Sequence, residues 1–294
     1  MGPVSSGGRR WIGCLLLLAT VTACGGPTPV VGRAPTPPPQ TAVSPALPPA
    51  SSHHVFVIVM ENRSYQQAMA EPFTAHLASQ YAVATNDHAV AHPSLPNYLA
   101  LTAGTTFGIT DDGYHRLPET GIGWQLSQRG IPWRAYMESM TDGCFSSPYP
   151  YAVKHNPFAY YGGTCPPNVV PLSQLPADLE SATPRFVWIT PNLCHDGHDC
   201  SSREADDFLA GLVPRILASP AWQQGGLLII TWDESSADND SNRVPAIVVA
   251  PNLVRHVTDR YHDHYSVLAT VEDWLGLPRL GEAAHAQAFD ELFL

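Results

Sequence analysis

Residues 54–60 read His-Val-Phe-Val-Ile-Val-Met, and Glu61 and Asn62 follow directly. A short run rich in valine and isoleucine is typical of a β-strand that is buried on both faces of a sheet. Open α/β sheets bind their ligands at the carboxyl ends of the strands, so a carboxylate and an amide at this point suggest an active site. The alternative for this one strand is that Glu61 and Asn62 only begin a turn.

The rest of the chain continues the alternation of apolar strands and amphipathic helices. This alternation predicts a mostly parallel sheet covered on both faces, a three-layer α/β/α sandwich spanning residues 51–294 as one domain. Pro214 inside an expected helix predicts a kink or a break there. Residues 138–178 are loop-rich and are expected to form an excursion over one edge. Further strands are expected at 132–137, 186–190, 227–232 and 245–250, and helices at 65–80, 96–102, 122–130, 203–218 and 264–275.

The N-terminal residues resemble an export signal, and we do not expect them to belong to the folded domain. Residues 1–23 carry two arginines before an apolar stretch that is too short to span a bilayer. They end in Val-Thr-Ala before Cys24, which resembles the bacterial lipoprotein signal, in which that cysteine is acylated. The alternative is an ordinary secretory signal. Residues 24–50 are rich in proline and are expected to form an extended tether. We therefore expect an exported protein, anchored to the membrane through Cys24 or secreted.

Four cysteines remain in the expected domain, and an even number in an exported chain predicts two disulfides. The pairs that close the shortest loops are Cys144–Cys165 and Cys194–Cys200, one of three possible pairings. A thiolate metal site is the alternative, but the spacings do not resemble those of a zinc site.

The charge balance excludes some partners. Without residues 1–23, which hold two arginines and no acid, 13 basic and 26 acidic residues remain, a formal charge of −13. Such a domain is not expected to bind nucleic acid or anionic lipid through its bulk charge. Acting on a phosphorylated substrate would require a local cationic centre, for which a bound divalent metal is the obvious candidate.

Polar side chains also follow two other expected strands. Asn192 and the stretch His195-Asp196-Gly197-His198 come after 186–190, and Asp233 and Glu234 come directly after 227–232. Carboxylate, amide and imidazole groups are ligands for divalent metals. Two adjacent carboxylates repel each other, and burying each costs several kcal/mol unless a cation compensates. The alternative is that one carboxylate caps a helix and the other lies in water.

Ser94, in His-Pro-Ser-Leu-Pro-Asn-Tyr at 92–98, is the candidate nucleophile. It precedes a short apolar helix, whose N-terminal amides and dipole favour an oxyanion or a phosphate. The alternative is that Ser94 only caps that helix. A serine hydroxyl is a poor nucleophile unless a base or a metal activates it. His155 and His264 are further candidates, although isolated histidines are most often surface residues.

Five motifs stand in this order along the chain: FVIVMENRS, HPSLPNYLALTAG, PNLCHDGHD, TWDES and HYSVLATVEDWLGLP. Together they resemble the bacterial phosphoesterase family, which includes secreted acid phosphatases and phospholipases C. The resemblance covers about residues 54–278 and implies an alkaline-phosphatase-like α/β/α sandwich. One departure is that some members have two aspartates where this chain has Asp233-Glu234, which leaves the metal's identity and coordination open.

The resemblance also implies roles for individual residues. It makes Ser94 the nucleophile and His155 a residue on the substrate side, where we also expect Asn97 and Asn192. Asp196, His198 and His264 would bind a second metal or, in members with one metal, the phosphoryl oxygens and the leaving group. The expected ligands of the first metal are Glu61, Asn62, Asp233 and Glu234, with Asn62 also touching phosphate.

The resulting hypothesis is an exported, metal-dependent acid phosphatase that hydrolyses phosphate monoesters, phosphoinositides included, through a phosphoserine intermediate. His198 or His264 would protonate the leaving group, and an acidic optimum is expected because histidine charges below about pH 6.5. The runner-up is a phospholipase C or another phosphodiesterase. Outside enzymes, the rival hypothesis is a tethered solute-binding lipoprotein.

Overall fold

The computed structural model describes residues 53–236, 241–251 and 253–293. The expected signal peptide, the lipidated Cys24 and the tether up to residue 50 lie outside these residues. Among the described helices, none has the length and apolar character needed to cross a membrane.

The described strands form one sheet, and most of their pairings are parallel. The order across the sheet is β4-β3-β5-β1-β6-β7-β2-β8, and β9 pairs with β2. Only the β6–β7 and β2–β7 pairings are antiparallel, so the prediction of a mostly parallel sheet is confirmed. The strands are β1 His54–Met60, β2 Ala82–His88, β3 Trp133–Met137, β4 Val169–Pro171, β5 Phe186–Thr190, β6 Gly226–Trp232, β7 Arg243–Val249, β8 Val257–Thr258 and β9 His262–Asp263.

Two of the expected helices differ from their predictions, and α5 and α7 were not predicted. The single helix expected at 65–80 is two helices, because the chain breaks before Pro72, whose ring suits the first helical turn. Of the kink or break expected at Pro214, the break is wrong: α6 continues past it, and only three residues remain before the helix ends. The helices are α1 Tyr65–Met69, α2 Pro72–Gln80, α3 Ser94–Ala103, α4 Gly121–Gln128, α5 Leu175–Ser181, α6 Ser202–Leu217, α7 Pro220–Gln223 and α8 His264–Leu275. The 3-10 helices are η1 Val153–His155, η2 Pro157–Ala159, η3 Leu172–Gln174, η4 Gly281–Ala284 and η5 Asp290–Phe293.

Strand β2 was not predicted from the sequence. It begins Ala-Val-Ala but continues Thr-Asn-Asp-His, and asparagine and aspartate are depleted in strands. Its pairing with β7 also shifts register between Ala84 and Asp87. Tertiary pairing overrides the weak local signal here.

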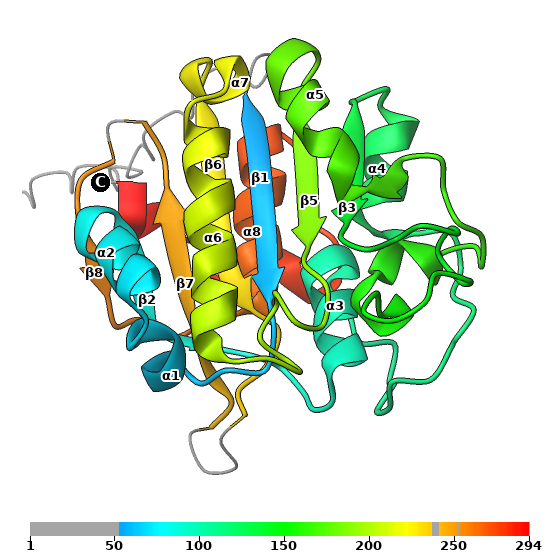
Figure 1. Cartoon of the computed structure of the whole chain (residues 1–294), viewed down its shortest axis with the longest axis horizontal. Coiled ribbons are helices and arrows are strands. Elements are labelled where there is room, and N and C mark those ends of the chain that lie inside the picture. The colour runs from blue at the N-terminus through cyan, green and yellow to red at the C-terminus, as the bar shows by residue number, and fades with distance from the viewer. Residues whose placement is uncertain (1–52, 237–240, 252, 294) are drawn as a thin grey trace, which may run out of the picture. The chain divides into compact units, whose positions relative to one another are not determined.

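The two faces of the sheet pack against separate sets of helices. Val55, Val57 and Val59 of β1 point into a core formed with α3, α4 and α8, while Phe56, Ile58 and Met60 point into a core formed with α1, α2, α5, α6 and α7. Figure 1 shows α6 in front of the sheet and α8 behind it. This arrangement confirms the three-layer sandwich.

The strand register brings the polar residues to one edge. Met60 of β1 lies opposite Trp232 of β6, so the residues that follow, Glu61 and Asp233, leave the sheet at the same level. The Asp233 amide donates to Met60 O at 2.9 Å, and the Glu61 amide donates to Asp196 O at 2.9 Å. The segments after β1, β5 and β6 are therefore joined at the carboxyl edge of the sheet.

The excursion after β3 and the segment after β5 each carry one disulfide. Cys144 is bonded to Cys165, and Cys194 to Cys200. The predicted pairing is confirmed.

Candidate active site

Ser94 is the first residue of α3, and its side chain lies in the middle of a charged cluster. It is buried, and its Oγ lies 2.8 Å from Glu61 Oε1 and 3.4 Å from Glu234 Oε1. Lys154 Nζ donates to the same Oγ at 3.2 Å. The serine proton therefore has carboxylate acceptors within reach, and the oxygen faces an ammonium group.

Three buried carboxylates, from Glu61, Asp233 and Glu234, come within 4.8 Å of one another. Asp233 Oδ1 accepts from the amides of Asn62 at 3.1 Å and Glu234 at 2.6 Å. Asp233 Oδ2 is buried without a hydrogen-bond partner among the described residues, whereas the buried Glu61 Oε2 has an ion-pair contact with His155 Nε2 at 3.3 Å. Burial, and then repulsion from Glu61 and Glu234, raises the pKa of Asp233 well above its usual value. Carboxylate oxygens in a buried acidic cluster are the donor set that a divalent cation would satisfy.

Asn62 adopts a left-handed backbone conformation, with φ at 51°. Asparagine tolerates this region better than most residues, and here it directs the Asn62 amide toward Asp233 Oδ1. The Asn62 side chain is partly exposed and makes no hydrogen bond to the described part of the chain. The side-chain amide of Asn62 is therefore available to a ligand.

His155 is buried between two carboxylates. Its Nε2 lies 3.3 Å from Glu61 Oε2, its Nδ1 lies 3.2 Å from Asp196 Oδ2, and its ring stacks on Tyr98 at 5.0 Å. Burial alone would lower the pKa of His155, but Glu61 and Asp196 outweigh it and raise the pKa to about 9. Conversely, His155 is the largest influence that opposes burial at Glu61, whose pKa falls to about 2. Glu61, His155 and Asp196 form a second group that could hold a cation.

The segment after β5 positions Asp196 and His198. Gly197 has φ at 105°, and a Cβ there would come within 3.2 Å of Glu61 O, so both its conformation and its packing require glycine. The His198 amide donates to Asp196 Oδ1 at 2.7 Å. The His198 ring contacts Asp199 at 2.6 Å through Nδ1, and its centre lies 6.2 Å from that of His155. About a third of the His198 side chain is exposed.

His264, the first residue of α8, has a different environment. It is fully buried, its Nε2 donates to Asp233 O at 2.6 Å, and its Nδ1 has no described partner. Burial lowers the pKa of His264 to about 4, although the hydrogen bond to Asp233 opposes the shift. It does not join Asp196 and His198 in any candidate ligand group of the described residues. His264 is thus a neutral support for the backbone at Asp233.

Asn97, which was also expected at the substrate, shapes the loop that precedes Ser94. Its Oδ1 accepts from the amides of Val90 and Ala91, each at 3.0 Å. Its Nδ2 donates to Ala91 O at 2.9 Å and to Pro93 O at 3.2 Å. These four bonds use the whole amide, which makes Asn97 a positioning residue for Ser94.

Asn192 has the same kind of surroundings in the segment after β5. Its Oδ1 accepts from the amides of Cys194 and His195, each at 3.0 Å, and its Nδ2 donates to Ser139 Oγ at 3.1 Å. The side chain therefore holds the turn that leads to Asp196.

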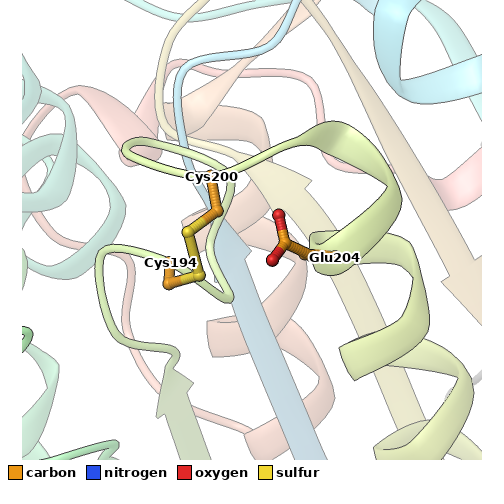
Figure 2. A group of neighbouring side chains, drawn as sticks. All are labelled: Cys194, Cys200 and Glu204. Carbon is orange, nitrogen blue, oxygen red and sulfur yellow. A yellow bond between two sulfur atoms is a disulfide. The ribbon is translucent and has the colours of Figure 1, made fainter.

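Cys194, Cys200 and Glu204 form another group with metal-ligand atoms close together. Figure 2 shows that the two sulfurs are joined in a disulfide beside Glu204. Glu204 accepts from the amide and the hydroxyl of Ser201, completing a capping box at the start of α6. The disulfide and the cap account for this group.

Three residues at the site were not predicted from the sequence. Lys154 Nζ donates to Asp112 Oδ2 at 3.0 Å as well as to Ser94, and His92 bonds Glu234 Oε2 through its Nδ1. Lys154 and His92 adjoin candidate residues in the sequence, which is a usable signal. Asp112 lies in a loop between α3 and α4 with no motif around it, so only the tertiary structure identifies it.

Comparisons with known sequences show which proteins this chain resembles. A model of the "Phosphoesterase family" matches residues 65–278. A probable acid phosphatase of Kluyveromyces lactis is 31% identical over 253 residues, covering 79% of this chain and 60% of that protein. A phosphatidylinositol-3-phosphatase of Mycobacterium tuberculosis is 30% identical over 253 residues, covering 82% of each. The chain spans about 60% of the length of the fungal acid phosphatases that it matches.

Solved structures share the fold at low identity. A protein of the alkaline phosphatase superfamily from Vibrio parahaemolyticus has a TM-score of 0.58 at 11% identity, covering 76% of this chain and 66% of that one. A phosphonate monoester hydrolase from Silicibacter pomeroyi has a TM-score of 0.55 at 11% identity, covering 82% and 76%. These likenesses show an alkaline-phosphatase-like fold.

Proposed function

Because this chain belongs to the phosphoesterase family, we propose that it is a metal-dependent acid phosphatase that hydrolyses phosphate monoesters through a phosphoserine intermediate. One observation carries the proposal: Ser94 Oγ lies within hydrogen-bonding distance of a buried carboxylate cluster and of an ammonium group. A hydroxyl that only capped α3 would not require this concentration of charge around it. A solute-binding protein would not require it either.

The cation ligands in this proposal are Glu61, Asp233 and Glu234, with Asn62 beside them. Their fit rests on Asp233 Oδ2, which has no hydrogen-bond partner among the described residues, and on the raised pKa of Asp233. A divalent cation held there supplies positive charge that favours the serine alkoxide and the phosphoryl oxygens. Asp196, with His155 and Glu61, would hold a second cation if the protein binds two.

The chain's own residues perform the proton transfers. Ser94 Oγ attacks the phosphorus atom in line and gives up its proton to the adjoining carboxylates, while the bond to the leaving alkoxide breaks. His198 protonates that alkoxide, with Asp199 holding its Nδ1. Water then attacks the phosphoserine and His198 accepts the water's proton. As the bond between phosphorus and Ser94 Oγ breaks, the adjoining carboxylate returns its proton to Ser94, and phosphate leaves.

Between the two expected acids, the surroundings favour His198. Its side chain reaches solvent, whereas the N–H of neutral His264 donates to Asp233 O inside the protein. We propose that replacing His198 by asparagine slows hydrolysis of an alkyl phosphate by 10²-fold or more and a nitrophenyl phosphate by under tenfold. The difference arises because a poor leaving group needs a proton and nitrophenolate does not. Equal losses on both esters would contradict this role.

The substrate class in this proposal includes phosphate groups on lipids, since one relative is named for phosphatidylinositol 3-phosphate. Anchoring through Cys24 would place the domain beside such lipids. The two disulfides support an exported, oxidising location.

The test is a substrate comparison with purified protein and divalent metals. We expect release of phosphate from nitrophenyl phosphate to exceed release of nitrophenol from bis(nitrophenyl) phosphate by at least tenfold in kcat/KM. The reverse ranking would favour a phosphodiesterase of the phospholipase C type. No turnover of either ester across a panel of divalent metals would favour the solute-binding alternative.

A further inference from the structure

Lys154 is the only lysine in the 294-residue sequence, in which the other 14 basic residues are arginines. This single ammonium group donates to the oxygen of Ser94 at 3.2 Å and to Asp112 Oδ2 at 3.0 Å. Its side chain is about one-fifth exposed, so it is partly withdrawn from water yet accessible. The ammonium group of a lysine is a compact point charge whose donors can rotate, whereas the guanidinium group of an arginine holds its donors in a fixed fork.

The other expected source of positive charge at Ser94 is partly occupied. The first turn of α3 was expected to offer free amides to a phosphate. However, the Leu95 amide already donates to Asp112 Oδ1 at 3.0 Å, and Pro96 has no N–H. The amides of the two residues directly after Ser94 are therefore unavailable to a phosphate, which makes the ammonium group of Lys154, in contact with Ser94 Oγ, the more direct donor to consider.

Asp112 holds the lysine in place. One carboxylate oxygen accepts from Leu95 N and the other accepts from Lys154 Nζ. The ammonium is thereby tied to the same helical turn that carries Ser94. The other hydrogen-bonding neighbours of Ser94 Oγ among the described residues are the carboxylates of Glu61 and Glu234, which cannot donate to a phosphate.

We propose that Lys154 is a catalytic residue that binds a non-bridging phosphoryl oxygen of the substrate and of the phosphoserine, and that Asp112 is its positioning residue. This inference rests on the proposed function for its reaction. Binding of phosphate at Lys154 Nζ, on which the inference depends, can also be measured without turnover.

The first experiment uses Lys154→Met and Lys154→Arg. We expect Lys154→Met to lower kcat/KM for nitrophenyl phosphate about 10- to 100-fold and to weaken inhibition by orthovanadate at least tenfold, since a charged hydrogen bond to the phosphoryl group is lost. Lys154→Arg should recover part of the lost kcat/KM and part of the lost inhibition by orthovanadate. Metal content and thermal stability should stay at wild-type values. Unchanged orthovanadate inhibition in Lys154→Met would overturn the proposal.

The positioning role is tested by Asp112→Asn, which keeps an acceptor for Leu95 N but removes the charge beside Lys154. We expect KM and the orthovanadate inhibition constant each to increase about fivefold, with a smaller change in kcat. The matched control is Asp207→Asn, which breaks the exposed pair with Arg203 and should change neither. An Asp112→Asn variant with wild-type KM and inhibition would remove Asp112 from the proposal.

The single lysine permits a further measurement that needs no catalysis. An amine-acylating reagent can modify only Lys154 and the terminal amine, and peptide mass spectrometry separates the two. We expect inorganic phosphate to protect Lys154 but not the terminal amine. If phosphate protected Lys154 but no ester were hydrolysed, the proposed function would be wrong and the phosphate site would still stand. Turnover without protection, combined with normal Lys154→Met kinetics, would sink this inference alone.

Discussion

The two halves of the candidate site are built differently. On the serine side, formed by Ser94, Glu61, Asp233, Glu234 and Lys154, the charged groups crowd around one oxygen. On the histidine side, formed by Asp196, His155, His198 and His264, each imidazole has its own partner and its own degree of exposure. The serine side therefore acts as a unit, whereas the histidine side consists of separate groups with separate roles.

Two fully buried histidines show how far the partner decides the charge. His155 lies between two carboxylates and has a pKa of about 9, while His264 faces a main-chain carbonyl and has a pKa of about 4. Burial lowers the pKa in both cases. Only the carboxylates at His155 reverse the effect, so burial by itself does not predict protonation.

The largest expected effect is on the serine side. Ser94→Ala should lower kcat for nitrophenyl phosphate by about 10³-fold or more, because no other group replaces the nucleophile. The measurement is steady-state hydrolysis, with metal content and circular dichroism as controls. If Ser94→Ala kept full activity, the nucleophile would have to be reassigned.

Removal of divalent metal should have the next largest effect. A chelator should abolish most of the activity and lower the melting temperature, because three buried carboxylates then repel one another without compensation. Differential scanning calorimetry with and without added metal measures the shift. Asp233→Asn is the control and should show a smaller response to metal. Activity that survives complete demetallation would separate the serine side from metal chemistry.

On the histidine side, we expect His155→Gln to reduce the free energy of unfolding of the metal-free protein by about 3–5 kcal/mol, since two buried carboxylates lose their cation. His198→Gln is the matched control and should cost under about 1 kcal/mol, because His198 is partly exposed. Urea unfolding of both variants makes the comparison. Equal losses of unfolding free energy in the two variants would show that the two carboxylate contacts of His155 do not stabilise the protein more than the contact of His198 does.

The smallest expected effect is a pH dependence due to His264. Its pKa is about 4 in the folded protein and near 6.5 when unfolded, so below pH 6.5 the unfolded chain binds the extra proton. Stability should fall as pH decreases from 6.5 to about 4, by at most about 1.4 kcal/mol per pH unit from this group. His264→Asn should flatten the curve of unfolding free energy against pH in this window. An unchanged slope would contradict the neutral state of His264.

Much of the fold was predictable because its signals are local. The apolar runs that end at Met60 and Trp232 identify buried strands, and the carboxylates after them identify the active edge of the sheet. The missed strand at Ala82–His88 has the opposite cause, because its pairing with β7 overrides a weak local preference. The break expected at Pro214 does not occur, and only three residues of α6 follow this proline.

The sequence by itself determined which residue types follow which strands, and hence the sheet, the candidate nucleophile and the candidate acidic ligands. Only the tertiary structure separated His264 from His198, assigned Asn97 to its own loop and brought Lys154 and Asp112 to Ser94. The physical reason is the range of each interaction. Strand periodicity and adjacent carboxylates are visible over a few residues. In contrast, the contact between Lys154 and Ser94 joins positions 60 residues apart and exists only after the loops have folded onto the sheet.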